Sequence, residues 1–145
     1  MNKQDGFSLV ELLIVLSILT IILFIGGTIH IKTYQQYQFN QWYQIFSNDI
    51  LRMQQDTIIS NKNLYLTINP TSNVYEIRKG GLGELIISRE IPKKWNINLY
   101  SLKIPLSFSK NGTIKKPGRF QIVIADKTRE IVFPFGKGRC YVREK

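Results

Sequence analysis

The chain has 145 residues, and its 20 Lys and Arg residues outnumber its 10 Asp and Glu residues, so its formal net charge is +10 at pH 7. Cys140 and His30 are the only cysteine and histidine, which excludes an internal disulfide framework and a zinc site with the usual four ligands. The length accommodates one domain plus an anchor, and the excess positive charge favours anionic partners such as nucleic acid, acidic lipid or cell-wall polymer.

The segment from Phe7 to Ile31 is apolar except for a few small or interfacial residues and one charged residue, Glu11, near its start. Because roughly 20 apolar helical residues cross the hydrocarbon core of a bilayer, this pattern predicts a transmembrane helix over 7–31. A cleaved secretory signal peptide needs a cleavage site of small residues after the apolar run, and none follows Ile31. An uncleaved signal anchor is the remaining alternative, but it leaves the costly intramembrane carboxylate of Glu11 unexplained.

The residues around Glu11 form a specific motif. The run Gly6-Phe7-Ser8-Leu9-Val10-Glu11 resembles the cleavage and assembly motif of type IV prepilins. The resemblance implies that a prepilin peptidase removes residues 1–6 as a cytoplasmic leader by cutting after Gly6, and that Phe7 becomes the N-methylated amino terminus. It also implies that Glu11 neutralises the amino terminus of a neighbouring subunit in a filament, and a desolvated carboxylate does need such a partner.

The sequence departs from the prepilin pattern further along the helix. Major pilins commonly carry a proline there, whereas this chain has Gly26-Gly27-Thr28 and no proline before Pro70. Adjacent glycines weaken a helix by about 1 kcal/mol each relative to alanine, so we expect them to permit a similar local bend.

The stretch from Lys32 to Ser60 is polar and rich in glutamine, and it carries apolar residues at three- and four-residue spacing. This spacing predicts an amphipathic second half of the helix over 32–60, with the glutamines and Asp49 largely off the apolar face. A glutamine-rich coiled coil is the alternative, but the aromatic residues are too bulky for a regular heptad seam, so we expect the helix to lie against a sheet. The apolar positions are Phe39, Trp42, Tyr43, Phe46, Ile50 and Met53.

From residue 61 onward, short alternating runs separated by turn residues predict a β-rich globular head over 61–145. The expected fold class is α+β, with a long N-terminal helix followed by a small antiparallel β-sheet. We expect tight turns at Asn111-Gly112 and at Asp126-Lys127. Strands are predicted over 64–68, 74–78, 84–89, 96–102, 106–109, 119–125, 128–135 and 139–143.

The order of helix and strands, together with the segment from Phe135 to Arg143, resembles the D-type minor pseudopilins of Gram-positive competence pili and also the H-class pseudopilins of type II secretion. The resemblance implies a minor subunit of a pilus that captures and takes up DNA during transformation. It further implies a single-pass protein of the cell membrane, with its head outside and exposed at the cell surface once assembled. The implied partners are other pilin subunits, the prepilin peptidase, the membrane and double-stranded DNA.

Two clusters of basic residues are candidates for DNA contact. Strand alternation near the C-terminus puts Lys137, Arg139, Tyr141 and Arg143 on one face, where cations meet phosphates and an aromatic ring stacks. The alternative, which such charge runs more often reflect, is a solvated sheet edge protected against aggregation. The second cluster surrounds the Asn111-Gly112 turn and comprises Lys110, Lys115, Lys116 and Arg119.

Cys140 alternates to the opposite side of this predicted strand, together with Val142. We therefore expect a buried thiol that packs as a small apolar residue, with an intermolecular disulfide outside the membrane as the alternative.

The sequence contains no His-Glu-x-x-His, Gly-x-Ser-x-Gly or Walker-type phosphate-loop motif. We therefore expect a non-enzyme that uses no cofactor and no metal. Two alternative functions remain open: a minor pseudopilin of a protein-secretion system, and a monomeric membrane-anchored DNA-binding module that keeps its leader.

Overall fold

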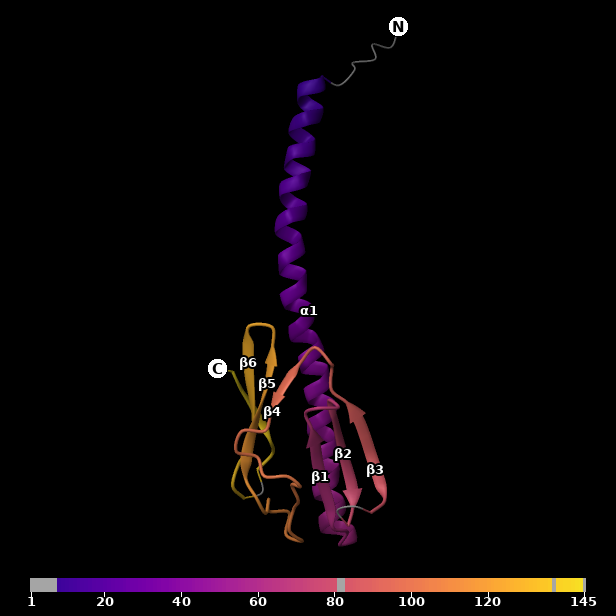
Figure 1. Cartoon of the computed structure of the whole chain (residues 1–145). Coiled ribbons are helices and arrows are strands. Elements are labelled where there is room, and N and C mark those ends of the chain that lie inside the picture. The colour runs from indigo at the N-terminus through magenta and orange to yellow at the C-terminus, as the bar shows by residue number, and fades with distance from the viewer. Residues whose placement is uncertain (1–7, 81–82, 137, 145) are drawn as a thin grey trace. The chain divides into compact units, whose positions relative to one another are not determined.

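The computed structural model describes residues 8–80, 83–136 and 138–144, although the side chains of residues 26–32 lie outside the described set. One long helix, α1 (Leu9–Ser60), is followed by a series of short strands (Figure 1). The strands are β1 (Leu64–Asn69), β2 (Val74–Lys79), β3 (Leu85–Glu90), β4 (Asn96–Asn98), β5 (Gly118–Ile124), β6 (Lys127–Phe133) and β7 (Tyr141–Glu144). The chain divides into two units, Met1–Gln41 and Trp42–Lys145.

Helix α1 confirms the predicted helix, and its backbone remains helical through Gly26 and Gly27. In the first unit, every large apolar side chain from Leu9 to Ile25 is more than half exposed. Among the residues whose side chains are described, no helix is both long enough and apolar enough to cross a membrane. The predicted transmembrane segment over 7–31, which extends beyond those residues at both ends, is therefore not confirmed by the structure.

The second unit, called the head below, is built around the part of α1 that follows Gln41. The ring of Phe46 is fully buried and lies 5.1 Å from that of Tyr75 on β2, 5.8 Å from Phe120 on β5 and 6.3 Å from Phe133 on β6. One helical side chain thus contacts residues from both sheets, and aromatic rings dominate the energetics of such a core. The predicted packing of the helix against β-structure is confirmed, and the coiled-coil alternative is wrong.

The head contains two antiparallel sheets, in the orders β1-β2-β3 and β4-β5-β6-β7, where the sequence predicted one. Between β4 and β5 the chain returns to the first sheet, where Leu66 and Leu106 exchange two backbone hydrogen bonds of 2.8 and 2.9 Å. The predicted strand over 106–109 is therefore reduced to isolated bridges, the other joining Phe108 to Ile114.

The strand boundaries also differ from the prediction by one or more residues, and two of these differences have a clear local cause. Strand β4 ends at Asn98 rather than at residue 102, because the Asn98 side chain accepts a hydrogen bond from the Tyr100 backbone N–H and Tyr100 turns the chain with a φ of 48°. The β5–β6 turn is Ala125-Asp126 rather than Asp126-Lys127, since Ile124 pairs with Lys127 and Ala125 has a φ of 53°.

Candidate functional site

The candidate processing site lies at the start of α1. Gly6 and Phe7 are outside the described residues, so the structure places neither. Glu11 lies in the first turn of the helix and is exposed. A carboxylate at this position is stabilised by the helix dipole, and within the part of the chain that the structure describes no cation forms an ion pair with it. Glu11 is thus available to a charge outside those residues.

Between Leu9 and Ile25, the part of the apolar helix whose side chains the structure describes, the hydroxyls of Ser17 and Thr20 do not interrupt the apolar surface. Ser17 donates to the carbonyl of Leu13 at 2.8 Å, and Thr20 donates to the carbonyl of Leu16 at 2.7 Å. Because each hydroxyl is satisfied one turn back on its own helix, neither requires water or a polar partner. The exposed surface from Leu9 to Ile25 can therefore be covered by apolar groups at little cost.

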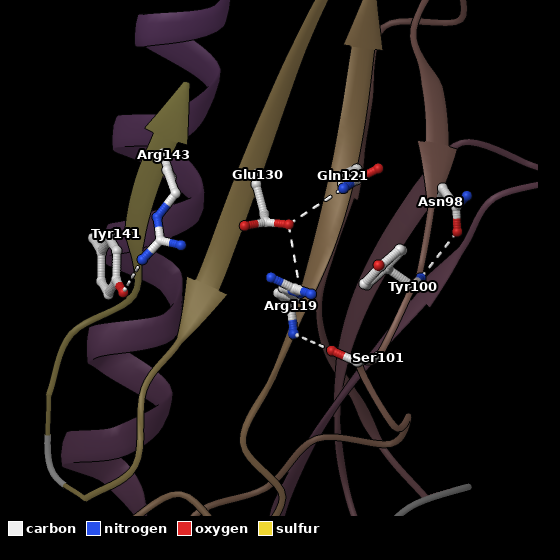
Figure 2. A network of polar contacts seen from close by, with 8 residues as sticks. All are labelled: Asn98, Tyr100, Ser101, Arg119, Gln121, Glu130, Tyr141 and Arg143. Carbon is white, nitrogen blue, oxygen red and sulfur yellow. Dashed lines mark hydrogen bonds and ion pairs between the residues drawn. The ribbon is translucent and has the colours of Figure 1, made fainter. Parts of the chain in front are cut away.

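The C-terminal basic cluster lies at and just before β7, an edge strand of the second sheet. The predicted alternation holds for the described residues, because Arg139, Tyr141 and Arg143 are exposed whereas Cys140 is buried and Val142 is half-buried. Lys137 lies outside the described residues. The Arg143 guanidinium also donates to the Tyr141 hydroxyl at 3.5 Å, so a cation and a ring share this face (Figure 2).

The arginines of the head divide into two groups. Every ion pair that the structure shows among the described residues uses an arginine, never a lysine: Arg52, Arg78, Arg89, Arg119 and Arg129 each contact a carboxylate. Arg139 and Arg143 take part in none of these ion pairs. The two arginines of the C-terminal cluster are thus the two whose charge is not neutralised by an ion pair in the described part of the chain.

Arg119, from the second predicted cluster, is engaged within the protein. Its Nε lies 3.5 Å from a carboxylate oxygen of Glu130 on β6, and its guanidinium carbon lies 4.7 Å above the centre of the Tyr100 ring. Gln121 donates to the same Glu130 oxygen at 3.2 Å (Figure 2). Arg119 is therefore a poor candidate for phosphate contact, which corrects the prediction from sequence spacing.

Glu130 is a residue that the sequence analysis missed. It is only 2% exposed although it lies on the outer face of its sheet, opposite Arg143 on β7. Cross-strand neighbours share a face, so Arg119, Arg143 and Gln121 surround one buried carboxylate. The signal in the sequence was strand alternation. Glu130 lies between Arg129 and Ile131, which the structure shows to be buried, so alternation turns Glu130 away from the core.

The lysines of the second cluster remain exposed. Lys110, Lys115 and Lys116 flank a tight turn in which the Ser109 N–H donates to Thr113 O at 2.8 Å, as the Asn111-Gly112 pair predicted. The Ile114 N–H donates to Gly136 O at 3.1 Å. This bond sets the lysine-bearing segment against the β6–β7 connection that leads to Arg139, so the two predicted clusters adjoin.

Cys140 is buried, and the Tyr43 hydroxyl donates to its backbone carbonyl at 2.8 Å. Burial raises the pKa of the Cys140 thiol, and it raises the pKa of Tyr43 to about 12. These observations favour a packed, unreactive thiol over an intermolecular disulfide. Within the described residues, no group of His, Cys, Asp and Glu side chains is arranged to hold a metal ion.

Comparison with known proteins supports the resemblance derived from sequence. Residues 1–26 match the family model of the prokaryotic N-terminal methylation motif, which includes Gly6, Phe7 and Glu11. The chain is 26% identical to competence protein ComGD of Bacillus subtilis (strain 168) over 145 residues, which cover 100% of this chain and 97% of that protein. No solved structure matches significantly. The chain thus carries a prepilin-type N-terminus and resembles a competence-type minor pseudopilin along its full length.

Proposed function

We propose that this protein is a minor subunit of a competence pilus, and that it helps to assemble the filament that captures and takes up DNA during transformation. The observation that carries the proposal is the combination of the methylation motif over residues 1–26 with similarity to a competence protein over the full length. The role is structural rather than catalytic, and the partners are a prepilin peptidase and other pilin subunits.

The proposed maturation uses three residues at the start of the chain. The peptidase cuts after Gly6 and releases residues 1–6, and Phe7 becomes the methylated amino terminus. Glu11 then pairs with the amino terminus of a neighbouring subunit when helices pack together. Its exposed position on a helix whose neighbouring side chains are apolar supports this role, because an ion pair gains strength where apolar groups exclude water.

Before assembly, the helix over 7–31 anchors the protein in the cell membrane with the head outside; after assembly, the same surface packs against other helices and the head reaches the cell surface. The support is the exposure of every large apolar side chain from Leu9 to Ile25. Exposed apolar surface of this extent requires an apolar environment, either lipid or neighbouring helices. In this scheme the amphipathic segment 32–60 joins the anchor to the β-rich part of the chain over 61–145.

The head contacts double-stranded DNA through Arg139 and Arg143, with Tyr141 beside them and Lys110, Lys115 and Lys116 contributing less specific attraction. The support is that Arg139 and Arg143 stand outside the ion pairs that engage the other arginines of the described chain. Phosphate contacts by exposed cations produce sequence-independent binding that weakens as salt rises. Lys137, two residues before Arg139 in sequence, belongs to the same proposed surface.

Two measurements, one on a deletion strain and one on the same strain after complementation, test this function. We expect loss of the gene to abolish transformation and DNA uptake while protein secretion continues, and we expect the protein in the sheared filament fraction of complemented cells. Normal transformation with impaired secretion would instead indicate a pseudopilin of a secretion system. Normal transformation with no protein in the filament fraction would contradict a role as a pilus subunit.

A further inference from the structure

One end of the head exposes large apolar side chains that nothing in the proposed function uses. At the C-terminal end of α1, Ile58 is 49% and Ile59 is 81% exposed, and Phe135 in the β6–β7 connection is 87% exposed. Burying such side chains is favourable in proportion to the apolar surface that is removed from water. Exposed apolar residues grouped in one place therefore mark an interaction site more often than isolated ones do.

Hydrogen bonds and close packing connect these residues through the turn at Ser109–Thr113. The Gln54 side chain donates to Gly112 O at 2.6 Å, and a Cβ placed on Gly112 would lie only 2.7 Å from Cδ1 of Ile58. The turn therefore packs closely on the end of α1. On its other side, the bond from Ile114 N–H to Gly136 O joins it to the segment that carries Phe135.

We call this surface the helix-end patch and define it by Ile58, Ile59, Phe135 and the turn between them. The end of α1, the connection from β4 to β5 and the connection from β6 to β7 gather at the same end of the head (Figure 1). The patch is thus assembled from three segments far apart in sequence, although its exposed side chains all belong to the same folded unit.

The border of the helix-end patch is positively charged. Lys62 follows the end of α1, Lys110 lies in the packed turn and Lys115 follows it, and all three side chains are exposed. Within the described residues none of these lysines forms an ion pair, whereas Asp56, the nearest acidic residue of the helix, is 4.0 Å from Arg52. An apolar centre with an uncompensated basic border remains.

We infer that the helix-end patch docks a second protein whose contact surface presents apolar side chains bordered by carboxylates. Complementary charge at the border sets orientation, while burial of the isoleucines and Phe135 supplies the contact energy. A second copy of this chain fits poorly, because like-charged lysine borders would meet. A nucleic acid fits poorly as well, because Ile58 and Ile59 offer it neither a hydrogen bond nor a stacking ring, and Phe135 is the one ring of the patch on which a base could stack.

The experiment uses the full-length chain in cells that also make the other pilus subunits, so the choice of partner proteins rests on the proposed function. A photoreactive benzoylphenylalanine replaces Ile59 or Phe135, and in a matched control it replaces Tyr100, an exposed aromatic on the outer side of the second sheet. We expect both patch positions, but not position 100, to cross-link to the same other subunit. The cross-linked partner peptide should lie beside Asp or Glu residues.

Charge variants complete the test. With the photoreactive group at position 59, the pair Lys62→Glu and Lys110→Glu should lower the cross-link yield several-fold, whereas Lys62→Arg with Lys110→Arg should retain it. Cross-links to copies of this chain, to DNA or to no protein, or a yield indifferent to charge reversal, would overturn the inference. A processed N-terminus in the same cells would show that the proposed function stands even if the docking inference fails.

Discussion

Asp49 of α1 and Arg89 of the edge strand β3 form a bidentate ion pair, with Nε 2.6 Å from Oδ2 and a terminal nitrogen 3.3 Å from Oδ1. The buried Tyr75 hydroxyl on β2 donates to the same Oδ2 at 2.8 Å. The hydrogen bonds to Asp49 raise the pKa of Arg89, so the guanidinium stays charged. One carboxylate thus fastens the helix to two strands of the first sheet.

Removing the Asp49 carboxylate should destabilise the head more than removing its arginine partner. Asp49→Ala leaves the Tyr75 hydroxyl buried without its acceptor, and we expect the free energy of unfolding to fall by about 3 kcal/mol. Arg89 is about half exposed at its side chain, so Arg89→Met should cost only about 1 kcal/mol. Denaturant unfolding of the purified full chain measures both, with the exposed Lys79→Ala as a control near zero. Equal losses in the two variants would contradict this assignment.

The head should lose stability in strong alkali through two tyrosines. Burial and then hydrogen bonding to Asp49 raise the pKa of Tyr75 well above its ordinary value of 10.0, and burial raises that of Tyr43 to about 12. Above pH 10 the unfolded chain releases these protons before the folded chain does, so the free energy of unfolding falls as pH rises towards 12.

Tyr43→Phe and Tyr75→Phe remove one such ionisation each. We expect each variant to show a shallower fall in the free energy of unfolding between neutral pH and the alkaline range than the unmodified chain, even where the variant is less stable at neutral pH. Tyr100→Phe, at an exposed ring, is the matched control and should leave the slope unchanged. Identical slopes for all four proteins would show that neither phenol is held neutral by the fold.

The carboxylate of Glu11 should be needed for assembly but not for folding of the head. We expect Glu11→Gln to lower the amount of protein in the sheared filament fraction at least about tenfold, the equivalent of 1.4 kcal/mol per contact, because a neutral amide cannot neutralise an amino terminus. Glu11→Asp should retain partial assembly. Thermal unfolding of the head should be unchanged in both variants. Normal filament incorporation of Glu11→Gln would show that assembly does not require the ion pair.

Arg139 and Arg143 should contribute directly to the salt dependence of DNA binding. Each phosphate contact adds about 0.9 to the slope of log affinity against log salt, so replacing both by alanine should reduce the slope by roughly 1.8 and weaken binding. The matched control replaces Lys93 and Lys94, which carry the same charge at another exposed position. Binding isotherms of the full chain to duplex DNA across a salt series provide the measurement. A similar loss in the control would mean that only net charge matters.

Glu130 should restrain DNA binding rather than support it. Glu130→Gln removes the carboxylate that partly neutralises Arg119 and lies opposite Arg143, so we expect tighter DNA binding with a steeper salt slope. The buried network loses a charged acceptor, and the free energy of unfolding should fall by about 1–3 kcal/mol. Weaker DNA binding in a folded Glu130→Gln protein would show that the carboxylate positions the basic face instead.

The sequence predicted the helix and the core face of the head because both depend on local periodicity. The spacing of Phe46, Ile50 and Met53 identified the side of α1 that is buried. Asp49 lies three residues after Phe46 and hence on that same side, but a carboxylate at such a position reads as solvated until its partners Arg89 and Tyr75 are known. Their distance in sequence from Asp49 hides the pairing.

The two-sheet arrangement and the ion pair of Arg119 with Glu130 depend on which strands are neighbours in a sheet. Alternation within one strand does not reveal its neighbours. Leu66 and Leu106 are far apart in sequence, so nothing local indicates that the chain returns to β1 between β4 and β5. Arg119 seemed to belong with Lys115 and Lys116 by proximity, whereas the β5–β6 register delivers it to Glu130. Long-range register, rather than propensity, decided these features.

The mature amino terminus of the cellular protein tests the central claim most directly. Mass spectrometry of the protein from cells with an active prepilin peptidase should identify a chain that begins at Phe7 with a methylated amino group, and the full-length precursor should accumulate when the peptidase is deleted. A protein that still begins at Met1 in peptidase-competent cells would contradict assembly as a pilin and would favour a membrane-anchored module that acts alone.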